Sequence, residues 1–340
     1  MRINLNFLSK YRNAILGIAI IEIIIFHFCA DCVTAVSYLG NPIVLKLAKV
    51  YVSVLGSVGV DFFVLLSGIG LYYSFSRNSD ISDFYRKRIN RIIPTYLFVG
   101  GILWFVRDLV VIGEPLHVFV EDLTMVSFWL EGNTLVWYIA FCIFVYILFP
   151  LLYKAINSSA EYRLISLLGL IGFSVLIVVF SYCCKIDVIN RLEIAIERIP
   201  LFLIGVYIGD DVKKQKMLSI KNYIAMIALF IVMFGISEKF FEGFLSRFAI
   251  GIYAFVLITI ISFLFEKVSS KSKTIINILS ALGNYSLGLY LSHVMIRDIF
   301  KQKGIHTEKL GVYCLIVVLS FMLSVIEAKI KSRFLGRDRV

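Results

Sequence analysis

The stretch AILGIAIIEIIIFHFCA, residues 14–30, decides the fold of this chain. Apart from Glu22 and His27, it contains only apolar residues and glycine. An α-helix needs about 20 mostly apolar residues to cross roughly 30 Å of hydrocarbon, so this run predicts a membrane span. Hydrocarbon cannot solvate a carboxylate or an imidazole, and such side chains therefore face other helices or a water-filled cavity. Glu22 and His27 are accordingly the first candidate functional residues.

The composition extends this interpretation to the whole chain. Hydrophobic residues make up 60% of its 340 residues and charged residues only 17%, and the mean hydropathy is +0.90. These values are typical of an integral membrane protein and exclude an ordinary soluble enzyme. The predicted fold class is therefore all-α, with about ten transmembrane helices.

Ten apolar runs are long enough to be candidate spans, and short connections join them. They lie near residues 14–31, 51–75, 94–112, 135–154, 163–183, 187–209, 222–237, 247–266, 278–297 and 310–328. The sixth run is polar in its first half, so we expect it to line a cavity or to lie partly outside the membrane. No linker or repeat divides the chain, and we expect a single domain over 1–340.

The distribution of basic residues predicts the topology. If the N-terminus is cytoplasmic, the cytoplasmic segments hold 22 of the 34 Lys and Arg residues, whereas the opposite side keeps the acidic loop 113–134. The positive-inside rule therefore favours both termini in the cytoplasm. The net charge of +11 is explained by this bias, because cytoplasmic lysines and arginines face anionic lipid; it requires the lipid bilayer as a partner and no nucleic acid.

The six cysteines do not predict a metal site. They are mostly within or at the ends of spans, and none has the spacing that holds zinc. We expect them to act as small apolar residues, and we expect no metal.

His27 has a candidate partner on its own helix. Asp31 lies one turn beyond it on nearly the same face, and Asp61 is a second possible partner at the start of another apolar run. A carboxylate that holds one imidazole nitrogen fixes the tautomer, and the other nitrogen can then act as a general base on a hydroxyl. The alternative is a histidine that only satisfies a backbone carbonyl of a neighbouring helix.

Two arginines mark the segment that enters the third span. Arg88 and Arg91 are three residues apart, so on a helix their guanidinium groups share one side, an arrangement suited to binding phosphate oxygens. The alternative is a basic cluster that only orients the spans.

A second polar stripe lies near the end of the chain. Ser286, Tyr290, His293 and Arg297 follow one another at spacings of four, three and four, which places them on one helix face. Such a stripe must face other helices or water. Contacts between helices would explain Ser286 and Tyr290 equally well, whereas we expect His293 to belong to a site.

Together these residues resemble the membrane acyltransferase type 3 family, which O-acylates sugars of bacterial surface glycans. The resemblance covers nearly the whole chain and rests on six groups of residues in the family's order. They are Leu16-Gly17-Ile18-Ala19-Ile20 with Phe26-His27; Gly59-Val60-Asp61-Phe62-Phe63 with Leu66-Ser67-Gly68; Arg86-Lys87-Arg88 with Arg91-Ile92-Ile93-Pro94-Thr95-Tyr96; Trp137-Tyr138-Ile139 with Tyr146 and Pro150; Arg198-Ile199-Pro200 with Phe202 and Gly205; and Gly283-Asn284-Tyr285-Ser286 with Tyr290-Leu291 and His293.

The resemblance implies an O-acyltransferase in the bacterial inner membrane. It implies acetyl-CoA or another acyl-CoA as the donor and a glycan or lipid-linked saccharide as the acceptor. By resemblance His27 is essential, and Arg88 and Arg91 bind the donor. From the spacing described above we expect Asp31 or Asp61 to orient His27. We expect substrate contacts from the following residues: Glu22, Trp137, Arg198, Ser286, Tyr290 and His293.

The chain departs from the family's pattern at one position. Many members carry an arginine eleven residues before the histidine, and here that residue is Leu16. Arg12 lies one turn earlier; it either replaces that arginine in donor binding or belongs only to the interfacial flank of the span. Some relatives carry a C-terminal hydrolase-like domain, which we do not expect after the tenth span.

Two other functions fit some of these features. A transporter of a polar or lipid-linked solute would also use many spans with polar residues at mid-membrane, but the sequence shows no inverted repeat. A scaffold without catalytic activity would fit the loss of the first-span arginine. A transporter has no need of a base beside an acidic residue together with an arginine pair at a cytosolic entrance.

Overall fold

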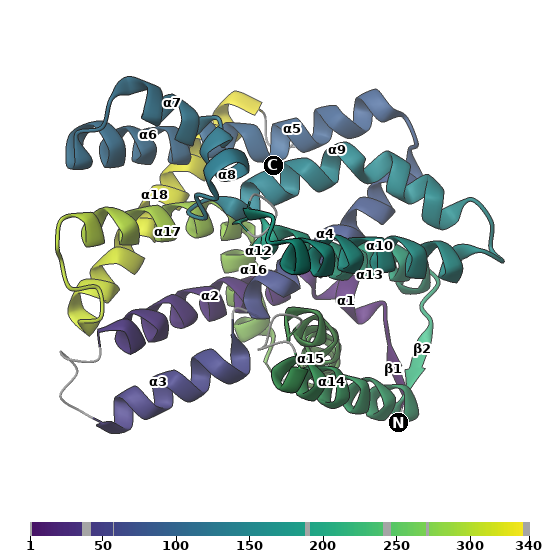
Figure 1. Cartoon of the computed structure of the whole chain (residues 1–340). Coiled ribbons are helices and arrows are strands. Elements are labelled where there is room, and N and C mark those ends of the chain that lie inside the picture. Colours follow the sequence, from purple (N-terminus) through teal and green to yellow (C-terminus); the bar gives the residue numbers. More distant parts are fainter. Residues whose placement is uncertain are drawn as a thin grey trace. The chain divides into compact units, whose positions relative to one another are not determined.

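The computed structural model describes residues 2–35, 42–56, 58–187, 191–240, 246–269 and 272–335 (Figure 1). Within these ranges the chain is almost entirely helical, which confirms the predicted all-α class. The described strands are β1 (Arg2–Asn4) and β2 (Met217–Ser219), which pair antiparallel with Ile3 opposite Leu218.

The helices follow the apolar runs of the sequence, with additional short helices between them. They are α1 (Phe7–Lys10), α2 (Arg12–Thr34), α3 (Pro42–Leu55), α4 (Val58–Arg77), α5 (Ile81–Thr95), α6 (Gly101–Trp104), α7 (Leu116–Leu123), α8 (Val126–Glu131), α9 (Trp137–Asn157), α10 (Arg163–Cys184), α12 (Glu193–Ile196), α13 (Ile199–Lys213), α14 (Ile220–Phe240), α15 (Ser246–Val268), α16 (Lys273–Asn284), α17 (Ser286–Gln302) and α18 (Leu310–Leu335). Two π-helical segments, η1 (Tyr96–Gly100) and η2 (Phe105–Ile112), continue α5 on either side of α6.

The predicted number of ten spans is not confirmed. Of the helices described, seven are long and apolar enough to cross a membrane, or eight if α16 and α17, which meet at a 64° bend, form one broken span. In the described part of the sixth expected span, 187–209, the polar helix α12 is followed by the 15-residue helix α13, which begins at Ile199. The apolar part of α14, Ile220–Ile236, is also shorter than a full span.

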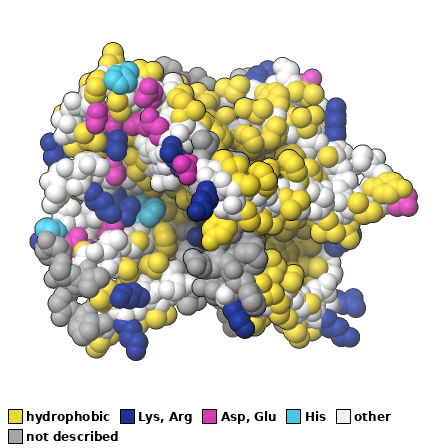
Figure 2. Space-filling view, viewed as in Figure 1, with side chains coloured by type: hydrophobic (Ala, Val, Ile, Leu, Met, Phe, Trp, Pro, Cys, Tyr) yellow, Lys and Arg dark blue, Asp and Glu magenta, His cyan; other side chains and the backbone are white. Residues whose placement is uncertain are grey.

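The surface agrees with a membrane environment. Hydrophobic side chains form broad areas on the face shown in Figure 2, and charged side chains gather in patches between them. Large apolar side chains such as Leu151, Phe173 and Leu176 are more than 60% exposed on the outside of their helices. A soluble protein rarely exposes so much continuous apolar surface, so the chain is a multi-pass membrane protein.

The chain divides into two compact units, each built from three segments. The first unit contains Met1–Ala19, Val60–Tyr85 and Phe141–Gly283, and the second contains Ile20–Gly59, Arg86–Ala140 and Asn284–Val340. In the first unit α14 packs along α15, and α13 contacts α10 and α15. In the second unit α17 packs along α18 and also contacts the π-helical segments.

Glycines of the resembling motifs allow helix backbones in the first unit to touch. A Cβ atom at Gly68 would lie 2.4 Å from the carbonyl oxygen of Phe202, and one at Gly205 would lie 2.5 Å from that of Leu65. The helices α4 and α13 therefore cross at backbone contact. Such close packing is how membrane helices associate where the hydrophobic effect gives no advantage.

A second glycine pair joins α2 to α16 in the same unit. A Cβ at Gly17 would lie 2.0 Å from the carbonyl oxygen of Leu279, and one at Gly283 would lie 1.9 Å from that of Asn13. Both glycines belong to the motifs on which the family resemblance rests. Because they lack a Cβ, they allow the backbones of α2 and α16 to come into contact.

In the second unit, small residues form the contact between α17 and α18. Gly288 faces Ser324, with the added Cβ position 3.3 Å from the serine side chain. The fully buried Ser292 hydroxyl lies 2.7 Å from the carbonyl of Gly288 and 3.0 Å from that of Ser320. This contact fixes the helix that carries His293.

The α2–α16 contact makes a testable prediction. We expect Gly283→Ala to lower the free energy of unfolding by about 1–3 kcal/mol, because the added methyl group cannot fit against the α2 backbone. The measurement is the thermal unfolding midpoint of the protein in detergent.

The control is Gly172→Ala, since a Cβ at Gly172 on α10 meets nothing within 4 Å. Alanine is favoured over glycine in a helix by about 0.5–1 kcal/mol, so this variant should be equally stable or more stable. Equal midpoints for the two variants would contradict the proposed close contact.

Candidate active site

Matching pairs of polar side chains join α2 to α17 in the second unit. His27 and Asp31 are four residues apart on α2, and His293 and Arg297 are four residues apart on α17. The rings of His27 and His293 stack with centroids 5.4 Å apart and planes inclined by 24°. One turn further along both helices, Asp31 binds Arg297. We call these two contacts the α2–α17 ladder.

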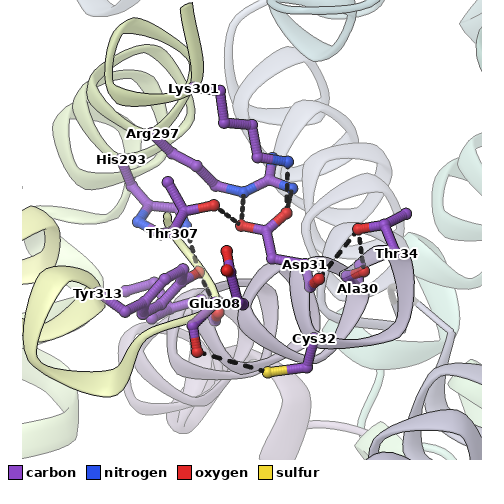
Figure 3. Close-up of polar contacts among 11 residues, drawn as sticks. Ala30, Asp31, Cys32, Thr34, His293, Arg297, Lys301, Thr307, Glu308 and Tyr313 are labelled. Atoms are coloured by element: carbon purple, nitrogen blue, oxygen red, sulfur yellow. Dashed lines mark hydrogen bonds and ion pairs between the residues drawn. The ribbon is translucent and has the colours of Figure 1, made fainter. Parts of the chain in front are cut away.

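Asp31 is the ionic centre of this ladder. Its carboxylate is 2% exposed and accepts hydrogen bonds from Arg297 Nε at 2.7 Å and Thr307 Oγ1 at 2.8 Å. Arg297 Nη2 and Lys301 Nζ also donate to it. Figure 3 shows Arg297 and Lys301 converging on the carboxylate. Two cations and a hydroxyl thus share one carboxylate.

The predicted hydrogen bond between Asp31 and His27 is therefore wrong. Both Asp31 oxygens bind the groups just described. Charge-assisted hydrogen bonds from guanidinium and ammonium groups are roughly twice as strong as bonds from neutral donors, which explains the choice of partners. Helical spacing placed Asp31 and His27 on one face correctly, but α17 supplies stronger partners for the carboxylate.

His27 itself combines an enclosed nitrogen with an accessible edge. Its Nδ1 is buried and has no hydrogen-bond partner among the described residues, whereas the residue as a whole is partly exposed. The buried face lies against His293, and Phe26 lies beside the ring with centroids 5.6 Å apart. Because Nδ1 is enclosed, Nε2 is the nitrogen available to a substrate.

His293 is completely buried and belongs to a chain of hydrogen bonds. Its Nε2 lies 3.0 Å from the hydroxyl of Tyr313 on α18, and this hydroxyl donates to the carbonyl oxygen of Ile24 on α2 at 2.6 Å. Its Nδ1 is buried, with no hydrogen-bond partner in the described part of the chain. That His293 belongs to a functional site stays a prediction, and these contacts define the position of its ring.

Asp61 does not bind His27 either. It belongs to the first unit, where its Oδ1 accepts a hydrogen bond of 3.1 Å from Arg198 Nε, and both side chains are almost fully buried. Its Oδ2 is buried with no hydrogen-bond partner among the residues described. A small cavity of about 20 Å³ beside the pair, also lined by Glu197 and Arg247, has room for about one water molecule.

The predicted substrate contacts of Glu22, Trp137, Ser286 and Tyr290 stay predictions. Glu22 Oε2 accepts a hydrogen bond of 2.6 Å from the backbone N–H of Gly59. It therefore stabilises the start of α4, because a carboxylate interacts favourably with the positive end of the helix dipole. The other three side chains are buried in the second unit.

Two of these residues join an aromatic cluster. The ring of Tyr138 packs edge-on against Trp137 and against Tyr290, with centroids 6.0 and 5.4 Å apart.

The predicted donor-binding arginines lie on α5. Arg88 and Arg91 are three residues apart on this helix, with Arg91 exposed and Arg88 partly so. Lys331 of α18 joins them, because its Nζ donates to the Arg91 carbonyl oxygen and to Thr95 Oγ1, both at 3.0 Å. In the second unit, α5 and α18 thus form a cationic patch of Arg88, Arg91 and Lys331. No pattern in the sequence pointed to Lys331.

Arg12 lies in the first unit, at the start of α2. Its guanidinium packs against α4, where a Cβ at Gly70 would lie 3.8 Å from Nε and Nη2. Leu16, at the position of the family's arginine, is buried. A donor-binding role for Arg12 stays a prediction.

The comparison with known proteins decides the class. A family model described as an acyltransferase domain matches residues 13–327. The chain belongs to the acyltransferase 3 family. It is also 29% identical over 129 residues to Acyltransferase MdmB of Streptomyces mycarofaciens, and the match covers 34% of this chain and 33% of that protein. The chain thus covers about a third of this relative's length. No solved structure matches the chain.

The acyltransferase holds further polar residues that sequence reasoning missed. Lys301 continues the four-residue spacing from Arg297, so the sequence did contain a signal for it. Thr307 and Tyr313 follow the end of α17 without any periodic relation to it. Arg107 of η2 is the centre of a separate polar cluster in the second unit. It binds Asp298 and Asp108 at 2.6 Å and stacks on Trp104.

The ion pair at the centre of the ladder can be tested through stability. We expect Asp31→Asn to lower the free energy of unfolding by about 3–5 kcal/mol, because it leaves Arg297, whose side chain is only 15% exposed, without its counter-ion. A second change, Arg297→Gln, should recover part of the loss, since the two residues interact directly. Thermal unfolding in detergent measures both effects.

The matched control is Glu266→Gln, which breaks the ion pair between Glu266 and Lys10, whose side chains are 33% and 50% exposed. An exposed pair contributes about 0–1 kcal/mol. A loss in Asp31→Asn no larger than in Glu266→Gln would show that the Asp31 pair is not a stabilising centre.

Proposed function

We propose that this membrane acyltransferase transfers an acetyl group from acetyl-CoA to a sugar hydroxyl of a cell-surface or lipid-linked glycan in the bacterial inner membrane. His27 acts as the general base. The observation that carries the proposal is the pair of stacked imidazoles, His27 and His293, in a chain that belongs to an acyltransferase family. Family membership also favours this function over a transporter.

The proposed reaction uses the accessible nitrogen of His27. The acceptor oxygen attacks the thioester carbonyl carbon of acetyl-CoA while its proton moves to Nε2 of His27. The tetrahedral intermediate then collapses, the bond between carbon and sulfur breaks, and the imidazolium gives its proton to the departing sulfur. The products are an O-acetyl ester and free coenzyme A, and His27 is neutral again.

The charges of the ladder suit an intermediate with negative charge. Arg297 and Lys301 together exceed the charge of Asp31 by one, and they lie one and two turns along α17 from His293. Fixed positive charge in a site of low dielectric stabilises an oxyanion more than it would in water. In this proposal Asp31 holds the two cations in place and takes no proton.

The cationic patch on α5 and α18 is the proposed binding site of the donor. Coenzyme A carries several phosphate groups, and a guanidinium group binds phosphate oxygens with two parallel hydrogen bonds. Arg91 is exposed and its neighbour Lys331 is held by the Arg91 carbonyl. A phosphorylated ligand that approaches from the aqueous phase would therefore bind to Arg88, Arg91 and Lys331.

The role of His27 predicts a catalytic defect without loss of folding. We expect His27→Gln to lower kcat by about 10²–10⁴-fold, the usual contribution of a general base. Purified protein, radiolabelled acetyl-CoA and a panel of methyl glycosides and lipid-linked monosaccharides provide the assay, with label in an alkali-sensitive ester as the readout.

His117→Gln is the control, because His117 is an exposed histidine on α7. It should keep kcat within about twofold of wild type. Wild-type-like turnover by His27→Gln would remove His27 from the mechanism, and absence of acetyl transfer by the wild type to any acceptor in the panel or in bacterial membranes would contradict the proposed function.

The donor site predicts an effect on KM. We expect Arg91→Ala to raise KM for acetyl-CoA by about 10-fold or more with little change in kcat, because a hydrogen bond to a charged group contributes about 1.5–3 kcal/mol. Lys331→Ala should have a smaller effect in the same direction. The control is Lys221→Ala, an exposed lysine on α14. An unchanged KM in Arg91→Ala would mean that the arginines only orient the helix.

A further inference from the structure

The hydrogen bonds around Tyr313 determine the tautomer of His293. The Tyr313 hydroxyl has a single proton and lies 2.6 Å from the carbonyl oxygen of Ile24, which can only accept. That proton is therefore used, and the contact of 3.0 Å with His293 Nε2 needs its hydrogen from the histidine. His293 thus carries its proton on Nε2, and its Nδ1 is a lone pair.

The ring of His27, stacked on that of His293, also has a buried nitrogen. Nδ1 of His27 is also enclosed and has no hydrogen-bond partner among the described residues. A buried polar atom without a partner is destabilising, and two lone pairs would not satisfy each other. A proton on Nδ1 of His27 makes the two nitrogens complementary, one a donor and the other an acceptor.

Stacking limits how the two nitrogens can interact. The rings lie nearly face to face, inclined by 24°, and an imidazole N–H points along its own ring plane. A direct hydrogen bond between stacked rings would be poorly aligned. A single water at the edge of the stack can accept from one nitrogen and donate to the other, as buried waters do between polar groups.

We propose that His293 is the positioning residue for His27. Its Nδ1 lone pair accepts, through one bridging water, the Nδ1–H of His27, and this keeps Nε2 of His27 unprotonated toward the acceptor hydroxyl. The full chain runs from His27 through the water, His293 and the Tyr313 hydroxyl to the carbonyl of Ile24. His293 and Tyr313 thereby do the work that a carboxylate does in a catalytic triad. The inference rests on the proposed function of His27 as the base.

The neighbouring acidic residue does not compete for this role. Asp31, one turn from His27 on α2, is bound by Arg297, Lys301 and Thr307. The chain proposed here also ends on α2, since Ile24 lies one turn before His27. The orientation of His27 is therefore held by α18 and α17 together.

The tautomers can be observed directly in the full-length protein. In detergent-solubilised protein labelled with ¹⁵N-histidine, imidazole nitrogen shifts separate protonated from bare nitrogens. We expect His293 to carry its proton on Nε2 and His27 on Nδ1, with His293→Asn and His27→Gln used to assign the signals. In Tyr313→Phe we expect His293 to become a mixture of both tautomers. A wild-type spectrum with the proton of His27 on Nε2 would overturn the proposal.

Kinetics tests the consequence for catalysis. We expect His293→Phe, which keeps a ring to stack on His27, to lower kcat by about 10²-fold or more while KM for acetyl-CoA stays within about twofold. His293→Asn places an amide oxygen near the position of Nδ1 and should recover at least a tenfold part of that loss. His117→Phe is the control on an exposed histidine.

The outcomes separate this inference from the proposed function. Loss of activity in His27→Gln together with wild-type kcat in His293→Phe would refute the positioning role and leave the function standing. Equal loss in His293→Phe and His293→Asn, with normal unfolding midpoints, would also overturn it, because the acceptor atom would then be irrelevant. A wild type without acetyl transfer would refute the function, whereas the histidine spectrum would still test the tautomers.

Discussion

The pairing of Arg297 with Asp31 is the constraint on which the second unit depends. A carboxylate and a guanidinium inside an apolar bundle are costly unless they satisfy one another, and here one carboxylate receives donors from α17 and from the segment that follows it. This demand brings α2 to α17. The stacked histidines one turn away are placed together as a consequence, so the stabilising contact and the proposed reaction centre share the same two helices.

Contacts between α17 and α18 support that pairing. Ser292 and Gly288 let α18 approach α17 closely, and α18 then supplies Tyr313 to both His293 and the α2 backbone. The same helix carries Lys331 to the carbonyl of Arg91. The helix α18 thus supports the proposed base through Tyr313 and the proposed donor site through Lys331. The two sites are therefore connected by one continuous helix.

Sequence reasoning found the class of fold and the family, and it singled out the two histidines whose rings stack in the structure, because each depends on local pattern. An apolar run interrupted by His27, or a stripe that contains His293, is visible in one dimension. The partner of Asp31 was predicted wrongly, since helical spacing shows which residues share a face and not what lies opposite. Thr307, Tyr313 and Lys331 were missed for the same reason. The span count is not confirmed among the described residues where polar residues shorten a helix, as in α13, and where the chain bends between α16 and α17.

The four-residue spacing on both α2 and α17 also specifies how the two helices align along their length. Sliding one helix by a turn in one direction would set the His27 imidazole beside the Arg297 guanidinium. Sliding it in the other direction would set Asp31 beside His293 and leave the guanidinium without a counter-ion. Apolar side chains would tolerate either shift, because they lack directional partners. The two polar contacts therefore specify a single register between the two helices.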